Sequence, residues 1–367
     1  MNKNKNITKE ILVFDAHCDT ANFLYDPTSY FIQENISHFN IDKARSGGLK
    51  AQIFALYVNP VYAPSKSIKK ALLLYNTLEK RLYSTGDAVK VTSTNEMESS
   101  LQKNKLACWL SLESGHIIEN SLDILEFFHN IGIKCMTLTH TKNTDWADSS
   151  GDIPNHNGLT KLGRKIITKM NKLGMVVDVS HSSDKTIEDV LEITSKPIMA
   201  SHSCSRALCD IPRNLPDSLI VEIANRNGYI GVNFYPGFLK KSINEQIMKN
   251  IEKESVRFNK QIKGKEDNPD LINRAEMKLC SKIVKGIDNV DLNAVIEHIL
   301  HIVDVGGIDC VGLGSDFDGI PFTPKGLEDV SKMPNITYEL VKRGYIEEDI
   351  MKIIGNNHLR LIKEVVG

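Results

Sequence analysis

MVVDVSH at residues 175–181 and PIMASHS at 197–203 are two short apolar runs that each reach a Ser-His pair, with a segment of one helix's length between them. Runs rich in β-branched residues are typical of strands, and parallel neighbours need a crossover connection such as a helix. If the two runs are neighbouring parallel strands, His181 and His202 emerge at the same end of the sheet. Two imidazoles side by side at the carboxyl ends of strands indicate a metal site or a proton-transfer site.

The same alternation of an apolar run with a helical segment recurs along the chain, and we count eight runs. They are almost continuously apolar, as expected for strands that are covered on both faces. The predicted strands are 11–16, 50–58, 106–112, 133–139, 175–180, 197–201, 229–234 and 310–315. The predicted helices include 67–84, 122–130, 159–173, 184–194, 217–226 and 291–305, with two more after the last strand. This pattern predicts a (β/α)8 TIM barrel.

The barrel is expected to occupy the whole chain, residues 1–367, as a single domain, because α/β barrels commonly reach this length. One insertion, at about 236–290, breaks the spacing between the seventh and eighth strands. It is rich in Lys, Glu and Asn, and we expect it to be partly helical with a flexible centre near 263–269. Loops at this face shape a substrate pocket or a subunit contact, but a solvent-exposed segment with neither role fits the composition equally well.

Composition and charge exclude several classes of partner. The 45 Lys and Arg against 46 Asp and Glu leave a formal charge of -1, which offers no net attraction to nucleic acid or acidic membranes. The start of the chain lacks the apolar core of a secretory signal, and no apolar stretch is long enough to span a bilayer. The seven cysteines form no C-x-x-C pair. We therefore expect a cytoplasmic protein with reduced thiols and with neither nucleic acid nor membrane as a partner.

Five strand-end residues form a candidate metal site. His17 and Asp19 are two residues apart at the end of the first run, so their side chains point the same way. Together with Glu113, His181 and His202 they supply three imidazoles and two carboxylates, a set that suits borderline divalent ions such as zinc. Five ligands exceed what one tetrahedral ion needs with an open position, but they suit two ions if Glu113 bridges them.

Two further strand ends carry candidate catalytic groups. His140 ends the fourth run, and its imidazole either stabilises the oxyanion of a tetrahedral intermediate or simply caps the strand. Asp316, in GSDFDG, is a candidate proton carrier beside a metal-bound water. Asp318 is the competing choice, because its spacing puts it on the same face. The seventh run ends in 233–235, which includes Tyr235.

The stretch after His202 contains two arginines, Arg206 and Arg213. A guanidinium fork suits a carboxylate, so one arginine is expected to hold a carboxyl-bearing substrate. The other is expected to pair with a nearby acid such as Asp210.

Trp146 and Asp148 follow His140 in a loop of the same barrel face. We expect both side chains to face the open carboxyl end of the barrel, although a loop tryptophan more often serves packing than recognition.

In this order, these residues resemble the membrane dipeptidase (renal dipeptidase) family of zinc metallopeptidases, in its soluble bacterial form. The resemblance covers nearly the whole chain, and many ordered matches are more specific than any one of them. The matching stretches are DAHCDT (15–20), ESGH (113–116), LTHTKN with ADS (138–149), the segment 158–181, SHSCSRALCDIPRNLPD (201–217), NFY (233–235), GLGSDFDG (312–319) and GNNHLRL (355–361).

The resemblance implies a TIM barrel of the metal-dependent hydrolase type with two Zn²⁺ per chain, although other divalent metals would fit. It implies that His17, Asp19 and bridging Glu113 hold one ion, and that Glu113, His181 and His202 hold the other. It also implies a structural role for Arg206 and catalysis by Asp316, His140 and Glu113. Contact with substrate is implied for His140, Arg213, Tyr235 and Asp316. It is also consistent with a homodimer.

Three departures from the family pattern affect these expectations. Asn22 stands where mammalian members carry a tryptophan, which changes the pocket wall. Ser114 stands where a glycine is usual after the bridging glutamate, which alters the local turn. Secretory and lipid-anchor signals are missing, so the membrane in the family name does not carry over.

The predicted function is hydrolysis of dipeptides by a hydroxide that two metal ions activate. The resemblance adds tolerance of a D-residue at the carboxyl side. One alternative is another barrel hydrolase that acts on a lactone, a cyclic amide, a phosphotriester or an acyl amino acid, because metal-activated water serves all these reactions. A second alternative is a non-catalytic metal-binding homologue.

Overall fold

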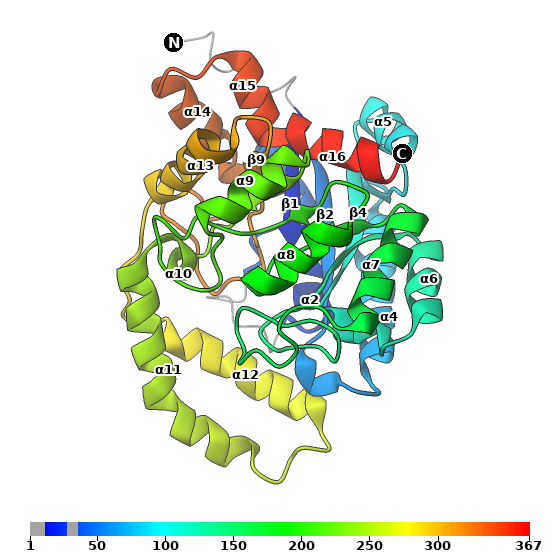
Figure 1. The fold of residues 1–367 in the computed structure, drawn as a ribbon. Helices are drawn as coiled ribbons and strands as arrows, with labels where there is room; N and C mark the ends of the chain where they lie inside the picture. Colours follow the sequence, from blue (N-terminus) through cyan, green and yellow to red (C-terminus); the bar gives the residue numbers. More distant parts are fainter. Residues whose placement is uncertain (1–11, 28–35) are drawn as a thin grey trace.

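The computed structural model describes residues 12–27 and 36–367, and in these ranges eight parallel strands form a closed barrel (Figure 1). The strands lie in the order β2-β1-β9-β8-β7-β6-β5-β4, and pairing of β2 with β4 closes the ring. Their bounds are β1 (Val13–Cys18), β2 (Leu49–Tyr57), β4 (Leu106–Glu113), β5 (Ile133–Thr137), β6 (Val176–Asp178), β7 (Met199–Ala200), β8 (Tyr229–Val232) and β9 (Val311–Leu313). Each overlaps one predicted run, so the predicted barrel is confirmed.

The observed strands differ from the predicted ones at their ends. Strand β7 contains two residues, whereas the predicted run 197–201 contains five, because the ladder stops where the chain turns into the loop that carries His202. A ninth strand, β3 (Ala88–Lys90), was not predicted. It pairs with the first three residues of β4 and is too short to show a periodic pattern.

Helices follow the strands and cover the barrel, and local signals set their ends. The predicted helices correspond to α4 (Ser67–Arg81), α6 (Leu122–Asn130), α7 (Lys161–Leu173), α8 (Asp184–Ile193), α9 (Asp217–Asn225) and α13 (Leu292–Gly306). Additional helices are α2 (Thr20–Tyr25), α3 (Ile41–Ser46) and α5 (Thr94–Gln102). The two helices predicted after the last strand are α14 (Pro334–Lys342) and a continuous helical stretch made of α15 (Glu347–Met351), a π-helical segment at 352–356 and α16 (Asn357–Val365). Ser183 caps α8 by accepting a hydrogen bond from the backbone N–H of Thr186, and Gly174 ends α7 at a φ of 68°.

The insertion between β8 and β9 is helical. It comprises α10 (Pro236–Leu239), α11 (Lys241–Ile262) and α12 (Pro269–Ile283). Figure 1 shows α11 and α12 as a hairpin at the end of the barrel opposite α16. The prediction of a partly helical insertion is confirmed, and the predicted centre at 263–269 lies at the turn between the helices, where its flexibility stays a prediction.

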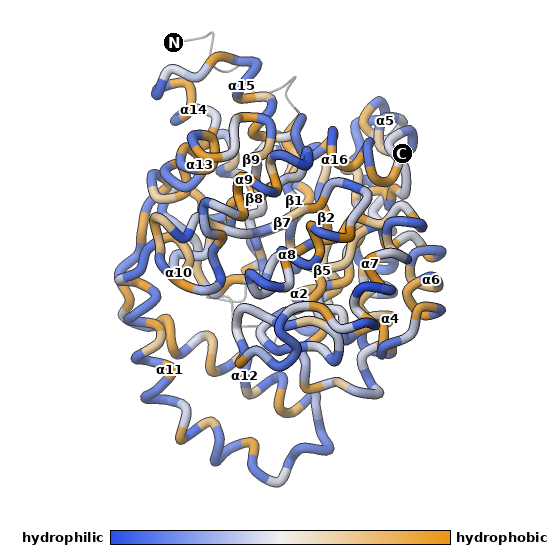
Figure 2. Tube along the Cα trace, in the orientation of Figure 1, coloured by the Kyte–Doolittle hydropathy of each residue, from blue (hydrophilic) through white to orange (hydrophobic). Residues whose placement is uncertain are grey.

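Apolar residues concentrate in the barrel strands, whereas the α11–α12 hairpin alternates hydrophilic and hydrophobic positions (Figure 2). All eight residues of β4 are buried, as expected for a strand that is covered on both faces. Helix α16 closes the amino-terminal end of the barrel, where Leu361 and Ile362 pack with Phe14 of β1. We call this end the floor and the opposite end the mouth. In the described parts of the chain every helix is too short or too polar to cross a bilayer.

Candidate metal centre

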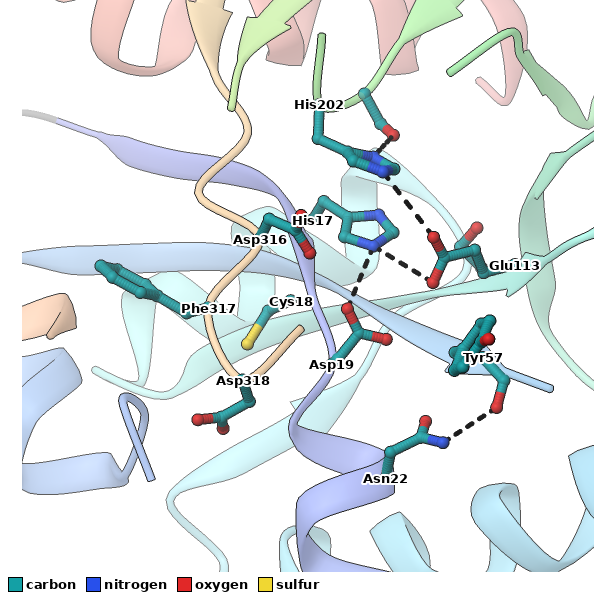
Figure 3. A network of polar contacts seen from close by, with 12 residues as sticks. His17, Cys18, Asp19, Asn22, Tyr57, Glu113, His202, Asp316, Phe317 and Asp318 are labelled. Carbon is teal, nitrogen blue, oxygen red and sulfur yellow. Dashed lines mark hydrogen bonds and ion pairs between the residues drawn. The ribbon is translucent and has the colours of Figure 1, made fainter. Parts of the chain in front are cut away.

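The ends of β1 and β4 bring together the first group of candidate ligands. His17 lies in β1, Asp19 is the residue before α2, and Glu113 is the last residue of β4. The Nε2 atom of His17 lies 3.3 Å from Oδ2 of Asp19 and 3.4 Å from Oε2 of Glu113 (Figure 3). Because all three side chains are buried, their polar atoms face one another and not solvent.

The ends of β6 and β7 supply the second group. His181 and His202 approach to 2.9 Å between their Nε2 atoms. These atoms lie 3.6 Å and 3.7 Å from Oε1 of Glu113, the oxygen that does not face His17. The structure therefore brings together all five residues predicted as metal ligands, with one oxygen of Glu113 directed to each group.

The electrostatics of these groups fit a divalent cation. Nε2 of His17 and Oδ1 of Asp19 are buried and make no hydrogen bond within the described part of the chain. Burial and the nearby charge of Glu113 raise the pKa of Asp19 to about 7. Burial lowers the pKa values of His181 and His202 well below the ordinary value, which keeps both rings in the neutral form that binds metals. A cation between these donors would bind their free lone pairs and offset the repulsion between the carboxylates.

A second layer of hydrogen bonds orients His202. Its Nδ1 lies 2.6 Å from Oγ of Ser201, which donates a 2.6 Å hydrogen bond to Oδ2 of Asp178. Because Ser201 donates its hydroxyl proton to Asp178, the serine oxygen can accept the Nδ1 proton of His202. This leaves Nε2 of His202 free to bind a metal. The sequence analysis did not identify Asp178 as a site residue. A carboxylate inside the apolar run VVDVSH is unusual, and it could have indicated this role.

His140 borders the second group. Its Nε2 lies 3.8 Å from Oε1 of Glu113, and its ring packs 4.2 Å from that of His181. Burial, followed by the charges of Arg213 and His17, lowers the pKa of His140 to about 3. The ring is therefore neutral at physiological pH, and its Nε2 can carry a proton toward the cavity.

Asp316 lines the cavity close to the first group. Its Oδ2 accepts a 2.9 Å hydrogen bond from the side chain of Asn233. Both Asp316 and Asp19 pack against Gly319, where a Cβ would lie 2.2 Å from one oxygen of each carboxylate. Burial raises the pKa of Asp316 to about 7, and the charge of Asp19 acts in the same direction. A carboxyl group with this pKa can take up and release a proton near neutral pH.

The expectation that Asp318 shares the face of Asp316 is wrong. Figure 3 shows its carboxylate pointing away from His17. It accepts hydrogen bonds from Thr20 and Ser37 and from the backbone N–H of His38. The turn after β9, in which Asp316 and Asp318 both have positive φ values, breaks the two-residue periodicity on which the expectation rested.

The two arginines have separate contacts. Arg213 donates to Oγ of Ser203 and to the carbonyl of His202, and its buried Nε has no hydrogen bond from the described residues. Arg206 forms a two-pronged ion pair with Asp184 and not with Asp210, which instead pairs with Lys241. The predicted partner was wrong because α8 carries Asp184 close to Arg206, a proximity that sequence distance does not show.

Trp146 and Asp148 do not face the mouth, contrary to expectation. Trp146 is fully buried against Gly115, where an added Cβ would lie 2.1 Å from the indole ring. Asp148 accepts backbone hydrogen bonds from Asn155 and Gly158 and holds its own loop. Both residues therefore shape the loop instead of lining the cavity.

The cavity above the two groups is lined by residues that follow several strands and by part of the insertion. Tyr235 lines it as predicted and packs edge-on against Phe238. Asn22, which donates to the backbone carbonyl of Tyr57, lines it near Asp19. One face of α12 forms the opposite wall, and this contribution is absent from the strand-end motifs.

Comparison with known proteins gives a consistent family. A family model described as membrane dipeptidase (peptidase family M19) matches residues 1–366. Among curated relatives, dipeptidase 3 of Homo sapiens is 29% identical over 362 residues, which cover 96% of this chain and 64% of that protein. Dipeptidase 3 of Mus musculus is 27% identical over 370 residues, which cover 98% of this chain and 65% of that protein. The chain thus spans about two thirds of the length of these relatives.

Solved structures share the fold. The probable dipeptidase PvdM from Pseudomonas aeruginosa has a TM-score of 0.82 and 26% identity, with 99% of this chain and 97% of that chain covered. A metallo peptidase from Rhodobacter sphaeroides, liganded with a phosphinate mimic of the dipeptide L-Ala-D-Ala, has a TM-score of 0.76 and 22% identity. Its alignment covers 97% of this chain and 99% of that one. At this level of identity the second similarity establishes the barrel alone.

Proposed function

Because this chain belongs to the membrane dipeptidase family, peptidase family M19, we propose that it is a metal-dependent dipeptidase. The single observation that carries the proposal is the position of Glu113, whose two carboxylate oxygens are directed to separate groups of buried donors. The names of the related proteins, which include a metallo peptidase liganded with a dipeptide mimic, support the same class of substrate.

The proposed cofactor is a pair of Zn²⁺ ions. His17, Asp19 and Glu113 would hold one ion, and Glu113, His181 and His202 the other. This mixture of imidazole and carboxylate donors suits zinc, and other divalent metals of similar preference would also fit. When bound, such ions supply an activated water near neutral pH and stabilise negative charge on a carbonyl oxygen.

The remaining residues are proposed to bind and orient the dipeptide. Arg213 would hold its terminal carboxylate through its guanidinium, whose Nε has no hydrogen bond from the described residues. His140 would donate a hydrogen bond to the oxygen of the scissile carbonyl, because its neutral ring lies beside Glu113. Tyr235 would form a wall for the substrate. A carboxylate clamp one residue beyond the scissile bond would exclude longer peptides.

Asp316 is proposed to move the proton that hydrolysis requires. Its pKa of about 7 permits both protonation states at neutral pH, and Asn233 holds its carboxylate at the cavity. It would take a proton from the attacking water and deliver it to the nitrogen of the leaving amino acid. Glu113 stays a ligand throughout.

Metal analysis combined with a substrate panel tests this proposal. The purified protein should contain close to two divalent ions per chain, and the loaded protein should hydrolyse L-Ala-L-Ala and L-Ala-D-Ala but not lactones or N-acyl amino acids. Replacement Arg213→Met should reduce kcat/KM for a dipeptide far more than for its carboxyl-amidated analogue. Full activity of a metal-free preparation, or preference for a lactone, would contradict the proposal.

A further inference from the structure

The cavity above the metal centre extends well beyond the proposed ligands. Its volume is about 690 Å³, within the range typical of small-molecule sites. Beyond Asn22 it continues into a region that we call the distal compartment, which is lined by Tyr25, Tyr62, Lys70, Asp270 and Arg274. None of the roles proposed so far uses these five residues.

Helix α12 forms the roof of the distal compartment, and polar contacts hold it in place. The hydroxyl of Tyr62 donates a 2.6 Å hydrogen bond to Oδ1 of Asp270 near the start of α12. One turn later, Nη2 of Arg274 lies 3.2 Å from Oδ2 of Asp26, which follows α2. The roof therefore connects the insertion to the loops after β1 and β2, and it encloses the space between them.

Lys70 of α4 is a buried cation inside this compartment. Its side chain reaches the cavity, yet the residue is only 7% exposed. The ammonium lies 3.8 Å from the centre of the Tyr25 ring and 5.2 Å from that of Tyr62. Over the described ranges the ammonium has no hydrogen bond and no ion pair within 4 Å. Burial lowers the pKa of Lys70, and the more distant charges of Asp270 and Asp26 offset only part of that effect. Ring faces attract a cation but do not accept its N–H protons as an oxygen does, so the ammonium can still bind an acceptor.

The distal compartment lies across the mouth from Arg213. Lys70 and Tyr62 follow β2, whereas Arg213 follows β7, and in the ring of eight strands β2 and β7 are four positions apart. If Arg213 holds the carboxyl end of a dipeptide, the side chain of the amino-terminal residue extends toward Lys70. The six residues of α2, Thr20–Tyr25, correspond to about 9 Å along the helix axis. A long side chain is therefore needed to reach the ammonium from the scissile bond.

We propose that Lys70 binds the side-chain carboxylate of the substrate's amino-terminal residue, so that the protein prefers dipeptides that begin with glutamate. This inference rests on the proposed dipeptidase function and names the substrate class for the same site. Glutamate fits better than aspartate because the added methylene extends its carboxylate toward α4.

The opposite preference, for a basic side chain, would require Asp270 or Asp26 to be the recognising group, and Asp26 is already paired with Arg274. Asp270 is exposed and already accepts the hydroxyl of Tyr62, so water and a phenol satisfy its carboxylate. Lys70 is buried without an oxygen acceptor, and a buried charge gains most from a partner of opposite sign. The charged group in the distal compartment that lacks a hydrogen-bond acceptor is therefore the ammonium of Lys70.

Steady-state kinetics of the metal-loaded, full-length protein test the assignment. The probes are L-Glu-L-Ala, L-Gln-L-Ala and L-Lys-L-Ala, whose amino-terminal side chains are similar in length but differ in charge. The wild-type protein should prefer L-Glu-L-Ala over L-Gln-L-Ala by about tenfold in kcat/KM, mainly through KM, because the ammonium forms an ion pair with the carboxylate but only a charge–dipole hydrogen bond with the amide oxygen. The variant Lys70→Met, which keeps the aliphatic stem, should lose this preference, so its kcat/KM should fall by about tenfold more for L-Glu-L-Ala than for L-Gln-L-Ala.

Matched variants make the outcome decisive. Lys69→Met removes a neighbouring exposed lysine and should leave the preference intact, and Lys70→Arg should restore most of it. Retention of the glutamate preference in Lys70→Met, or a wild-type preference for L-Lys-L-Ala, would overturn the assignment while leaving the dipeptidase function in place. Failure of the loaded protein to hydrolyse any dipeptide, including L-Ala-L-Ala, would overturn the proposed function and this inference with it.

Discussion

The two ends of the barrel both bury histidines, but they use them differently. At the mouth, His17, His181 and His202 direct nitrogen atoms at Glu113. At the floor, His358 of α16 is stacked between Phe14, at 3.9 Å between ring centroids, and Tyr229, at 4.7 Å. Neither nitrogen of His358 has a hydrogen bond from the described residues. A buried histidine therefore indicates a metal site only where other donors converge on it.

The backbone shows the same contrast. Residues at the mouth adopt left-handed conformations that are costly for side chains: the φ values are 100° at Ser114, 66° at His181 and 60° at Asp316. Such strain persists where the surrounding structure enforces it, and it is typical of functional sites. Close packing against glycine occurs at both ends: an added Cβ would lie 1.8 Å from the carbonyl oxygen of Leu12 at Gly355 of the floor, and 2.2 Å from an oxygen of Asp316 at Gly319 of the mouth. The mouth differs because two of its strained residues, His181 and Asp316, carry side chains that line the cavity.

The variant Glu113→Gln should show the largest difference between the two ends, because it should impair function at the mouth without lowering stability. Loss of the bridging carboxylate should remove most bound metal and lower kcat by about 10³-fold, because metal ions supply several kcal/mol of transition-state stabilisation. The free energy of unfolding of the metal-free protein should not fall, because the substitution also removes a repulsive neighbour of Asp19. Metal content, kcat and urea unfolding provide the measurements, with Glu222→Gln on the exposed side of α9 as the control. Unchanged metal content would refute the bridging role.

The variant His358→Ala should produce the reverse pattern. It removes a fully buried ring from between two aromatic rings, so the free energy of unfolding should fall by about 2–4 kcal/mol. Metal content and kcat per folded molecule should stay at the wild-type level, because the change lies at the opposite end of the barrel. Urea unfolding followed by circular dichroism measures the first effect. A specific loss of metal would show that the floor and the mouth are coupled and would contradict the view that His358 has a packing role alone.

Acid should destabilise the protein partly because His358 at the floor is protonated on unfolding, and this effect should be smaller than that of His358→Ala. Burial lowers the pKa of His358 to about 3, so the folded protein keeps this ring neutral while the unfolded chain protonates it near pH 6.5. The unfolded state thus binds more protons between these values, and stability falls as pH drops from about 6.5 toward 3. At pH 5 the contribution of His358 to this loss should be about 2 kcal/mol.

The variant His358→Phe isolates that contribution. It keeps an aromatic ring between Phe14 and Tyr229 but cannot be protonated. In metal-free protein, its free energy of unfolding should fall by about 2 kcal/mol less than that of the wild type between pH 7 and pH 5. Equal losses in the two proteins would mean that His358 is protonated in the folded state as well.

Much of the architecture was predictable because buried parallel strands leave a strong local signal. Eight near-continuous apolar runs predicted the eight barrel strands, and the strand-end motifs predicted Glu113 and the four other residues grouped with it. The failures at the site concern loop residues. Asp318, Trp146 and Asp210 lie in loops, where side-chain direction follows turns and packing instead of a regular period.

The sequence by itself determined the order of strands and helices, the polar residues at the strand ends and the family to which the chain belongs. These features depend on local patterns of apolar and polar residues. Tertiary structure alone decided that the two oxygens of Glu113 face different groups, that α12 roofs the cavity, and that Lys70 is buried there without an acceptor. Each of these depends on barrel closure, which brings β1, β4 and β7 together over separations that no local pattern encodes.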